Sequence, residues 1–372
     1  MRAREKILCV VGARPNFMKI APIIEAMQSH PRLEPLLLHT GQHYDQAMKD
    51  SFFHQLGIPE PDVDLEVGSG SHAVQTAQIM QRFEPVLDQI SPRAVLVVGD
   101  VNSTIACGLV ASKKQLPLIH VEAGLRSYDR AMPEEINRVL TDQISDLLFT
   151  TELDARENLI REGIPEDRIH FVGNVMIDAL FKNLKLAVPA ASVVESHGFS
   201  LPGKYAVLTL HRPANVDDAE TLAGLLEVVV AASHRIPILF PCHPRTSAMI
   251  DRHQLHSILA AGKVTLLPPL GYLEMIGLVS SADMVLTDSG GLQEETTALG
   301  IPCITLRENT ERPITVTEGT NTIVGRDPDK IMGSVDAVLS SGGKRGRIPE
   351  LWDGKAAQRI VEIIGTRLLE AV

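Results

Sequence analysis

Short runs rich in valine, isoleucine and leucine recur along the chain between segments long enough to form helices. In the first half these runs are Ile7–Val11, Leu36–His39, Val95–Gly99, Leu118–Glu122, Leu147–Thr150 and Ile169–Gly173. Near-continuous apolar strands that alternate with helices are typical of a parallel sheet covered on both faces. The pattern therefore predicts an α/β domain with a doubly wound, Rossmann-like sheet over residues 1–186.

The pattern lapses after about Phe181 and resumes near Tyr205. Residues 187–204 contain Pro, Ser and Gly without a sustained period, and we interpret them as a linker. A second set of apolar runs follows: Tyr205–Leu210, Pro237–Cys242, Val264–Leu267, Met284–Thr287, Cys303–Leu306 and Thr322–Val324. These runs predict a second Rossmann-like domain over residues 205–354.

The chain closes with an amphipathic pattern over residues 355–372, which predicts a helix able to pack on either domain, including back on the N-terminal one. Two such domains joined by a linker leave a cleft between them. Ligands of these sheets bind beyond the carboxyl ends of the strands. We therefore expect the active site in the cleft, built from the turns that join strands to helices.

Composition narrows the class of protein. The 372 residues are 44% hydrophobic and 22% charged, which excludes bulk disorder, and the net charge of −11 without a Lys/Arg block disfavours binding to nucleic acid or to anionic membranes. No apolar run is long enough to span a bilayer, so we expect a cytosolic protein. Four isolated cysteines in apolar stretches predict buried thiols rather than disulfides or zinc ligands: Cys9, Cys107, Cys242 and Cys303.

Two cations follow the first predicted strand. Arg14 comes directly after it and Lys19 lies in the first turns of the next helix, where backbone N–H groups and the helix dipole also favour an anion such as phosphate. The Gly-x-Gly-x-x-Gly spacing is absent, which argues against an ordinary dinucleotide fingerprint. The next strand ends in a polar cluster around His43, which either touches a ligand or caps a helix.

Acidic residues end two later strands of the first half. Asp100 and Glu122 stand at the tips of apolar strands, where partial desolvation raises the pKa of a carboxyl and suits it to acid or base catalysis. A third acid, Glu134, lies in the first turn of a helix opened by proline, and Arg138 lies on the same face four residues later. Helix capping and catalysis explain these two residues equally well, whereas helix chemistry is the better explanation of Glu135.

In the second half, two strands stop at histidines. His211 and His243 are each followed closely by a proline that prevents the strand from continuing, which leaves both rings at the sheet edge. Neither has a metal ligand at helical spacing, so a metal site is the weaker interpretation. An acid, a base or a phosphate partner suits His211, whose ordinary pKa lies near neutrality.

The segment after Thr287 carries the most chemical information. Ser289, Gly290 and Gly291 form a turn between a strand and a helix, which suits a nest of N–H groups around a diphosphate. Glu294 or Glu295, one turn later, can accept hydrogen bonds from ribose hydroxyls. The loop that ends at Arg312 adds another cation.

Together these segments resemble the non-hydrolysing UDP-N-acetylglucosamine 2-epimerase family over nearly the whole chain. The matching segments, in order, are GARPNFMKIAP, TGQHYD, VVGDVNSTIA, HVEAGLRS, PEEINR, LTLHR, DSGGLQEE and TERP. The resemblance implies the glycosyltransferase-B architecture, a homodimer formed through the first domain, and interconversion of UDP-GlcNAc and UDP-ManNAc without a metal or any other cofactor. In the route it implies, a base removes the C2 proton as UDP leaves, and UDP then adds back to 2-acetamidoglucal.

The resemblance also assigns roles to the residues singled out above. Acids near C2 are implied at Asp100, Glu122 and Glu134, with the direction of proton transfer left open. A catalytic or phosphate-proximal histidine is implied at His211. Contacts with the UDP-sugar are implied or expected at Arg14, Lys19, His43, Arg138, His243, Ser289, Gly290, Gly291, Glu295 and Arg312.

Some positions depart from the family's pattern. Ile314 follows the TERP proline where many members have an acid, and the strand end HRPANVDD is found in part of the family. Val74 stands where regulated bacterial members have an arginine that binds a second UDP-GlcNAc, so we expect a weak or missing activator site. The same difference fits a relative that acts on a modified sugar such as a 2,3-diacetamido uronic acid.

Three other functions use similar residues. A hydrolysing epimerase on the same fold would release UDP and free ManNAc. A glycosyltransferase would need an acceptor, although three acids in the first domain suit proton transfer at carbon better. An inactive nucleotide-sugar sensor would bind UDP without turnover, and the presence of every proposed acid argues against it.

Overall fold

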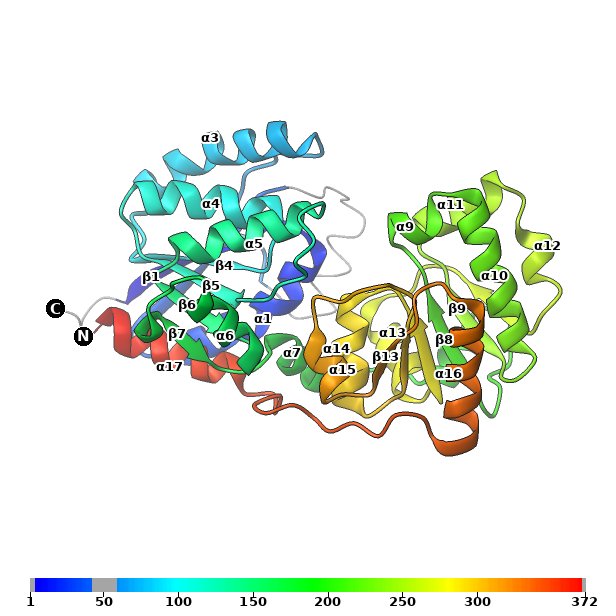
Figure 1. The fold of residues 1–372 in the computed structure, drawn as a ribbon. Coiled ribbons are helices and arrows are strands. Elements are labelled where there is room, and N and C mark those ends of the chain that lie inside the picture. Colours follow the sequence, from blue (N-terminus) through cyan, green and yellow to red (C-terminus); the bar gives the residue numbers. More distant parts are fainter. Residues whose placement is uncertain (1–3, 42–58, 370–372) are drawn as a thin grey trace. The chain divides into compact units, whose positions relative to one another are not determined.

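The computed structural model of the chain describes residues 4–41 and 59–369 (Figure 1). It divides into two compact units: unit 1 is Met1–Ala179 with Glu350–Val372, and unit 2 is Leu180–Pro349. The division falls within helix α7 (Val175–Leu184). Each unit has its own parallel sheet, which confirms the predicted pair of α/β sheets.

Unit 1 is built on a seven-stranded parallel sheet with strand order β3-β2-β1-β4-β5-β6-β7. The order runs outward from β1 in both directions, which is the doubly wound pattern of nucleotide-binding folds. The strands are β1 Glu5–Val11, β2 Leu33–His39, β3 Val63–Asp64, β4 Ala94–Val98, β5 Leu118–Ala123, β6 Leu147–Thr150 and β7 Ile169–Phe171. Two-residue β3 was not predicted, because so short a strand leaves no period in the sequence.

Helices lie between the strands of unit 1, and one further helix near the C-terminus also belongs to this unit. They are α1 Arg14–Ser29, α3 His72–Ile90, α4 Asn102–Lys113, α5 Pro133–Ile144, α6 Leu153–Arg161, the short η1 Glu166–Arg168 and the C-terminal α17 Ala356–Leu369. Helices α3 and α4 bury Ile79, Phe83 and Cys107 against β1 and β4. These side chains belong to the apolar core of unit 1.

The C-terminal helix α17 belongs to unit 1 and lies beside α1 (Figure 1). Its first turn is capped by Asp178, whose carboxylate accepts hydrogen bonds from the backbone N–H groups of Ala356 and Ala357 at 3.1 and 2.8 Å. Near its end, the carbonyl of Leu368 accepts a hydrogen bond from Arg93. Both ends of α17 are thus held by residues of unit 1.

Unit 2 is built on a six-stranded parallel sheet with order β10-β9-β8-β11-β12-β13. The strands are β8 Ala206–Thr209, β9 Ile238–Pro241, β10 Val264–Leu267, β11 Met284–Thr287, β12 Cys303–Thr305 and β13 Asn321–Ile323. The helices are α8 Ala190–Ser196, α9 Pro213–Val216, α10 Ala219–Ser233, α11 Pro244–Arg252, α12 His256–Leu259, α13 Tyr272–Ser280, α14 Gly290–Leu299, α15 Pro313–Thr317 and α16 Pro328–Ser341. All six strands overlap the predicted apolar runs.

The segment 187–204, expected as a linker, contains helix α8, so this expectation is wrong for the middle of the segment. Ala190, Val193 and Val194 are buried in a core cluster shared with β8 and α13. The helix is only seven residues long, which is too short for a sustained apolar period to appear in the sequence.

Two further expectations concern the cysteines and membrane-spanning segments. All four cysteines are buried and carry no disulfide, as predicted, and burial raises the pKa of Cys9 to about 12. Among the described residues, no helix combines the length and the apolar character that crossing a membrane requires.

Candidate active site

The carboxyl ends of β4 and β5 lie side by side in unit 1, because these strands pair in parallel. Asp100 follows β4 immediately after Gly99, and Glu122 lies near the end of β5. Glu122 has a φ of 71° at a point where the register of β5 against β6 shifts between Val121 and Ala123. Such a bulge turns a side chain away from the regular alternation of a strand. The two predicted acids are therefore brought to one edge of the sheet.

Lys19, on α1, forms a buried ion pair with Glu122. Asn16, one turn earlier, donates a hydrogen bond to the carbonyl of Val98 at 3.1 Å and so fixes this face of α1 to the end of β4. A side chain at Gly99 would press against this ion pair, since an added Cβ would lie 3.3 Å from Glu122 Oε2 and 3.4 Å from Lys19 Nζ. The cation predicted for phosphate is thus the partner of the predicted acid.

Arg138 is buried on α5 and joins two carboxylates. Its Nη2 lies 2.5 Å from Asp100 Oδ2, and its Nη1 donates to Glu135 Oε2 at 2.9 Å. Glu135 also accepts hydrogen bonds from the backbone N–H groups of Ser127 and Tyr128, both at 2.9 Å. The spacing in the sequence placed Arg138 on the face of Glu134, but its partner on the helix is Glu135, because the guanidinium is drawn toward Asp100.

In unit 2, His211 and Asp288 follow the neighbouring strands β8 and β11. His211 Nδ1 lies 2.8 Å from Asp288 Oδ1. The fully buried carboxylate also accepts hydrogen bonds from the backbone N–H of Arg212 at 2.9 Å and from Asn215 Nδ2 at 3.2 Å. Burial alone would raise the pKa of Asp288, but these hydrogen bonds and the charge of His211 outweigh it, and the pKa is lowered. The carboxylate therefore stays ionised and fixes the imidazole.

The second predicted histidine, His243, is exposed at the start of α11. Its Nδ1 accepts a hydrogen bond from the backbone N–H of Arg245, and its ring centre lies 5.7 Å from that of His211. The two histidines predicted at strand ends are thus neighbours. His211 is held by the carboxylate of Asp288.

Ser289 precedes α14, and Gly290 and Gly291 form its first residues. Neither an acidic residue nor a capping side chain occupies this turn, so its N–H groups and dipole favour an anion. A side chain at Gly290 would displace the carboxylate of Glu311, because an added Cβ would lie 2.6 Å from Glu311 Oε1. The described turn is thus uncapped and free of acids in its first helical residues, and its contact with a diphosphate stays a prediction.

Glu311 lies at the centre of an arginine cluster beside this turn. Burial would raise its pKa, but the charges of Arg307, Arg312 and Arg212 hold the pKa well below its ordinary value. Arg312 also pairs with Glu294 at 2.8 Å. Three guanidinium groups thus surround Glu311, and Arg312 also reaches α14 through Glu294.

Glu295 is buried on α14 and accepts a hydrogen bond of 3.0 Å from Tyr272 Oη. Burial raises its pKa to about 7; the hydrogen bond from Tyr272 opposes the shift and the charge of Glu294 adds to it. Tyr272, at the start of α13, was not predicted as a site residue. Its only signal in the sequence is its place at a strand-to-helix turn.

Two predicted ligand contacts cannot be placed. His43 and the side chain of Arg14 lie outside the described residues, although α1 begins at Arg14. Asp288 stood inside the most informative segment but had no predicted role, and its position directly after a strand is the signal that could have found it. Glu311 lay unassigned within the TERP motif, although Arg307, four residues earlier in the chain, is a signal that could have found it.

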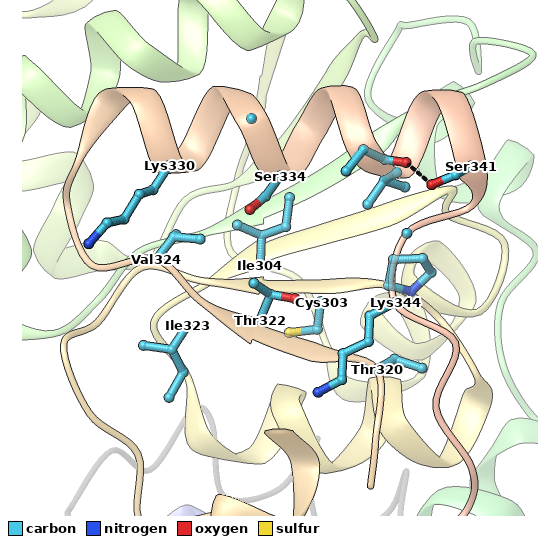
Figure 2. A pocket seen from close by; sticks show the side chains of 15 residues that line it. Cys303, Ile304, Thr320, Thr322, Ile323, Val324, Lys330, Ser334, Ser341 and Lys344 are labelled. Carbon is cyan, nitrogen blue, oxygen red and sulfur yellow. Dashed lines mark hydrogen bonds between the residues drawn. The ribbon is translucent and has the colours of Figure 1, made fainter. Parts of the chain in front are cut away.

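A pocket of about 430 Å³ lies elsewhere in unit 2, between α16 and strands β12 and β13 (Figure 2). Ile304, Val324 and Lys330 are among its lining residues, and none of the predicted site residues lines it. Lys344 Nζ, at one end, donates to the backbone carbonyls of Val316 and Asn321. The pocket is therefore separate from the strand ends that carry the predicted chemistry.

The model of the UDP-N-acetylglucosamine 2-epimerase family matches residues 25–365. A UDP-N-acetylglucosamine 2-epimerase of Methanocaldococcus jannaschii is 42% identical over 96% of this chain and 98% of its own. A UDP-2,3-diacetamido-2,3-dideoxy-D-glucuronate 2-epimerase of Pseudomonas aeruginosa is 40% identical over 96% of this chain and 99% of its own.

Solved structures agree with these matches. The crystal structure of the M. jannaschii UDP-GlcNAc 2-epimerase in complex with UDP-GlcNAc and UDP has a TM-score of 0.87 and 42% identity, and the match covers 96% of this chain and 99% of that one. A Neisseria meningitidis UDP-GlcNAc 2-epimerase bound to UDP-GlcNAc has a TM-score of 0.86 at 30% identity, with 96% and 99% of the two chains covered. Because fold and sequence agree over almost its whole length, the chain belongs to the UDP-N-acetylglucosamine 2-epimerase family, whose members are isomerases.

Proposed function

We propose that this protein interconverts UDP-N-acetylglucosamine and UDP-N-acetylmannosamine by inverting C2 of the sugar. The observation that carries the proposal is the juxtaposition of Asp100 and Glu122 at the ends of paired strands, each with a cationic partner, in a chain of this family. Inversion at a carbon centre needs one group that takes a proton and another that returns it to the opposite face. Two carboxyl groups at one sheet edge meet this need.

The reaction divides into two half-steps, and in each one every bond that breaks is matched by a bond that forms. In the first, a carboxylate takes the C2 proton, the C2–H electrons form the C1–C2 double bond, and the C1–O bond breaks with its electron pair going to UDP. In the second, UDP adds back at C1 while a proton is delivered to the other face of C2. Asp100, Glu122 and the half-buried Glu134 are the proposed proton carriers, and their order is open.

Unit 2 is the proposed UDP-binding unit. The N–H groups at the start of α14, with Arg312 and the surrounding arginines, suit a diphosphate whose negative charge grows as it leaves. Glu295 is the proposed acceptor of hydrogen bonds from ribose hydroxyls. His211, fixed through Nδ1 by Asp288, presents Nε2 as a donor or acceptor.

The direct test follows the sugar by proton NMR in deuterium oxide, with UDP-GlcNAc and no added metal or nicotinamide. We expect UDP-ManNAc to appear with deuterium at C2. Free ManNAc and UDP in place of UDP-ManNAc would identify a hydrolysing epimerase. Turnover that requires an added acceptor would identify a glycosyltransferase, and UDP binding without any exchange would identify a sensor.

A second candidate substrate is a UDP-2,3-diacetamido uronic acid. It is favoured by the P. aeruginosa relative, which is about as similar to this chain as the M. jannaschii enzyme. It is also favoured by Val74, exposed at the start of α3, where the sequence lacks the arginine expected for a UDP-GlcNAc activator site. The same NMR assay with the diacetamido compound distinguishes it from UDP-GlcNAc, because the true substrate is the one with the larger kcat/KM.

The family resemblance also supports a cytosolic homodimer. Light scattering of the purified protein tests the dimer, and a mass of one chain at micromolar concentration would refute it.

A further inference from the structure

His120 lies within β5 of unit 1 and is fully buried. Its Nδ1 lies 2.7 Å from Asp142 Oδ1, and its Nε2 lies 2.8 Å from the backbone carbonyl of Gly99. Both ring nitrogens therefore face oxygen acceptors. The ring thus links a buried carboxylate on α5 to the backbone at the end of β4.

Asp142 reaches this point from the last turn of α5, and it is fully buried as well. Its second oxygen accepts a hydrogen bond from the backbone N–H of Gly124 at 3.1 Å and lies 2.8 Å from Arg126 Nη2. Arg126 in turn bonds Glu162, through Nε at 2.8 Å and Nη2 at 2.5 Å. The carboxylate is thus held by donors on both of its oxygens.

The His120–Asp142 pair contacts both backbone turns that carry the proposed acids. His120 bonds the carbonyl of Gly99, and Asp142 accepts the N–H of Gly124. Gly99 immediately precedes Asp100, and Gly124 follows two residues after Glu122. All three residues that shape these turns have positive φ, namely 69° at Gly99, 71° at Glu122 and 80° at Gly124. A backbone in this region needs surrounding contacts to hold it, above all at Glu122, which is not glycine.

We propose that His120 and Asp142 are positioning residues that set the separation and orientation of Asp100 and Glu122 for proton transfer at C2. The inference rests on the proposed epimerase function and adds to it residues that would touch no substrate. Losing either member would free the turn at one strand end. A small displacement of a reacting group lowers the rate of a proton transfer steeply.

A purely structural role is the competing explanation. The desolvation cost of a buried ion pair offsets most of its Coulomb attraction, so such a pair is weak evidence for stability. The experiment must therefore measure the chemical step itself and the order of the two turns, besides the amount of folded protein.

The test uses His120→Phe, which keeps a ring without its hydrogen bonds, and Asp142→Asn, which keeps the shape but puts an amide where the carboxylate accepted donors. Asp146→Asn is the matched control, because Asp146 Oδ2 accepts the N–H of Leu118 at the opposite, amino end of β5. Each protein is assayed for kcat and KM with protium or deuterium at C2, for UDP affinity and stoichiometry by calorimetry, and for backbone hydrogen exchange.

For both variants we expect kcat to fall about 100-fold, with KM within about threefold of the wild type. The C2 deuterium isotope effect on kcat should increase, because proton transfer becomes more fully rate-limiting, and one UDP should still bind per chain. Backbone amides around Gly99 and Gly124 should exchange faster, while the control behaves like the wild type.

An unchanged isotope effect together with unchanged exchange at both turns would overturn the proposal, even if less folded protein were recovered. If the wild type itself does not exchange C2, the proposed function fails separately. Hydrogen exchange then still decides whether His120 and Asp142 hold the two turns, and the same rate in wild type and variants would refute it.

Discussion

Asp288 Oδ1 lies 2.8 Å from His211 Nδ1, and so joins the ends of the two central strands of unit 2 through a buried carboxylate and an imidazole. A carboxylate on Nδ1 fixes the ring orientation and favours the form with hydrogen on that nitrogen. Nε2 is then the nitrogen left to face a ligand. The turn proposed to bind the diphosphate begins with the residue after Asp288, so the imidazole and this turn are close to each other through the chain.

Asp288→Asn tests this relationship. The amide keeps the volume, but it cannot accept from the imidazole and from the backbone N–H groups together, so the ring should lose its orientation. We expect kcat to fall by a factor of about 100 to 10,000 in the UDP-GlcNAc assay. Steady-state kinetics measure this loss.

Thr209→Val provides the control. Thr209 and Thr287 form a hydrogen bond of 2.6 Å between the same two strands without touching the imidazole. Its loss should change kcat less than about threefold, the effect of one partly exposed hydrogen bond. If the two variants lose activity equally, Asp288 acts only by joining the strands.

The sequence was sufficient to locate the strand ends. An apolar run that stops at a polar residue, as at Asp100, His211 and Asp288, is a local signal, and parallel strands necessarily bring their carboxyl ends to one edge. The six strands of unit 2 follow the predicted runs for this reason. The candidate residues were found because the sequence alone gives both their residue type and their position directly after a strand.

The partners of those residues were not visible. His120 and Asp142 are 22 residues apart, and their contact depends on how α5 packs against β5. Arg138 illustrates the same limit, because helical spacing allowed Glu134 while the distant Asp100 decided the side-chain direction. The positive φ of Glu122 likewise arises from a register shift that has no pattern in the sequence.

Arg138→Lys should weaken the chemistry while leaving the charge unchanged. Arg138 spans Asp100 and Glu135 with separate nitrogens, and a single ammonium cannot reproduce this fork. We expect kcat to fall about 10- to 100-fold, because Asp100 loses its fixed position. Steady-state kinetics with UDP-GlcNAc provide the measurement.

Arg156→Lys is the control for this substitution. Arg156 pairs with Glu166, whose side chain is 71% exposed, so the same chemical change occurs in solvent. Its effect on unfolding should stay below about 0.5 kcal/mol, with activity unchanged. Equal activity of the Arg138 variant and this control would contradict the assigned role of Arg138.

Glu295 should make stability depend on pH in an unusual direction. Its pKa rises from 4.5 to about 7 on folding, so between these values the folded protein holds a proton that the unfolded chain has released. The contribution of Glu295 to stability therefore falls as pH rises through this window, by on the order of 2 to 4 kcal/mol. Glu295→Gln cannot lose a proton and lacks this dependence.

Urea unfolding of both proteins at pH 5 and pH 8 gives the measurement. All other groups titrate in both proteins, so the difference between variant and wild type isolates Glu295. We expect the free energy of unfolding of the variant, relative to the wild type, to be higher at pH 8 than at pH 5. A difference that does not change with pH would mean that the carboxyl of Glu295 titrates normally in the folded protein.

Gly277→Ala should destabilise unit 2, because α13 packs its backbone directly on the chain before α8. An added Cβ at Gly277 would lie 1.7 Å from the carbonyl oxygen of Val188, a fixed backbone atom, so the helix would have to move. We expect a loss of about 3 kcal/mol or more in the free energy of unfolding.

Gly224→Ala is the matched control in a helix, since the exposed Gly224 of α10 has open space where the methyl group would go. There the lower backbone entropy of alanine in the unfolded chain should stabilise the protein by about 0.5 to 1 kcal/mol. Urea unfolding of the two variants should therefore give shifts of opposite sign, and shifts of the same sign would mean that α13 does not meet Val188 as closely as the structure has it.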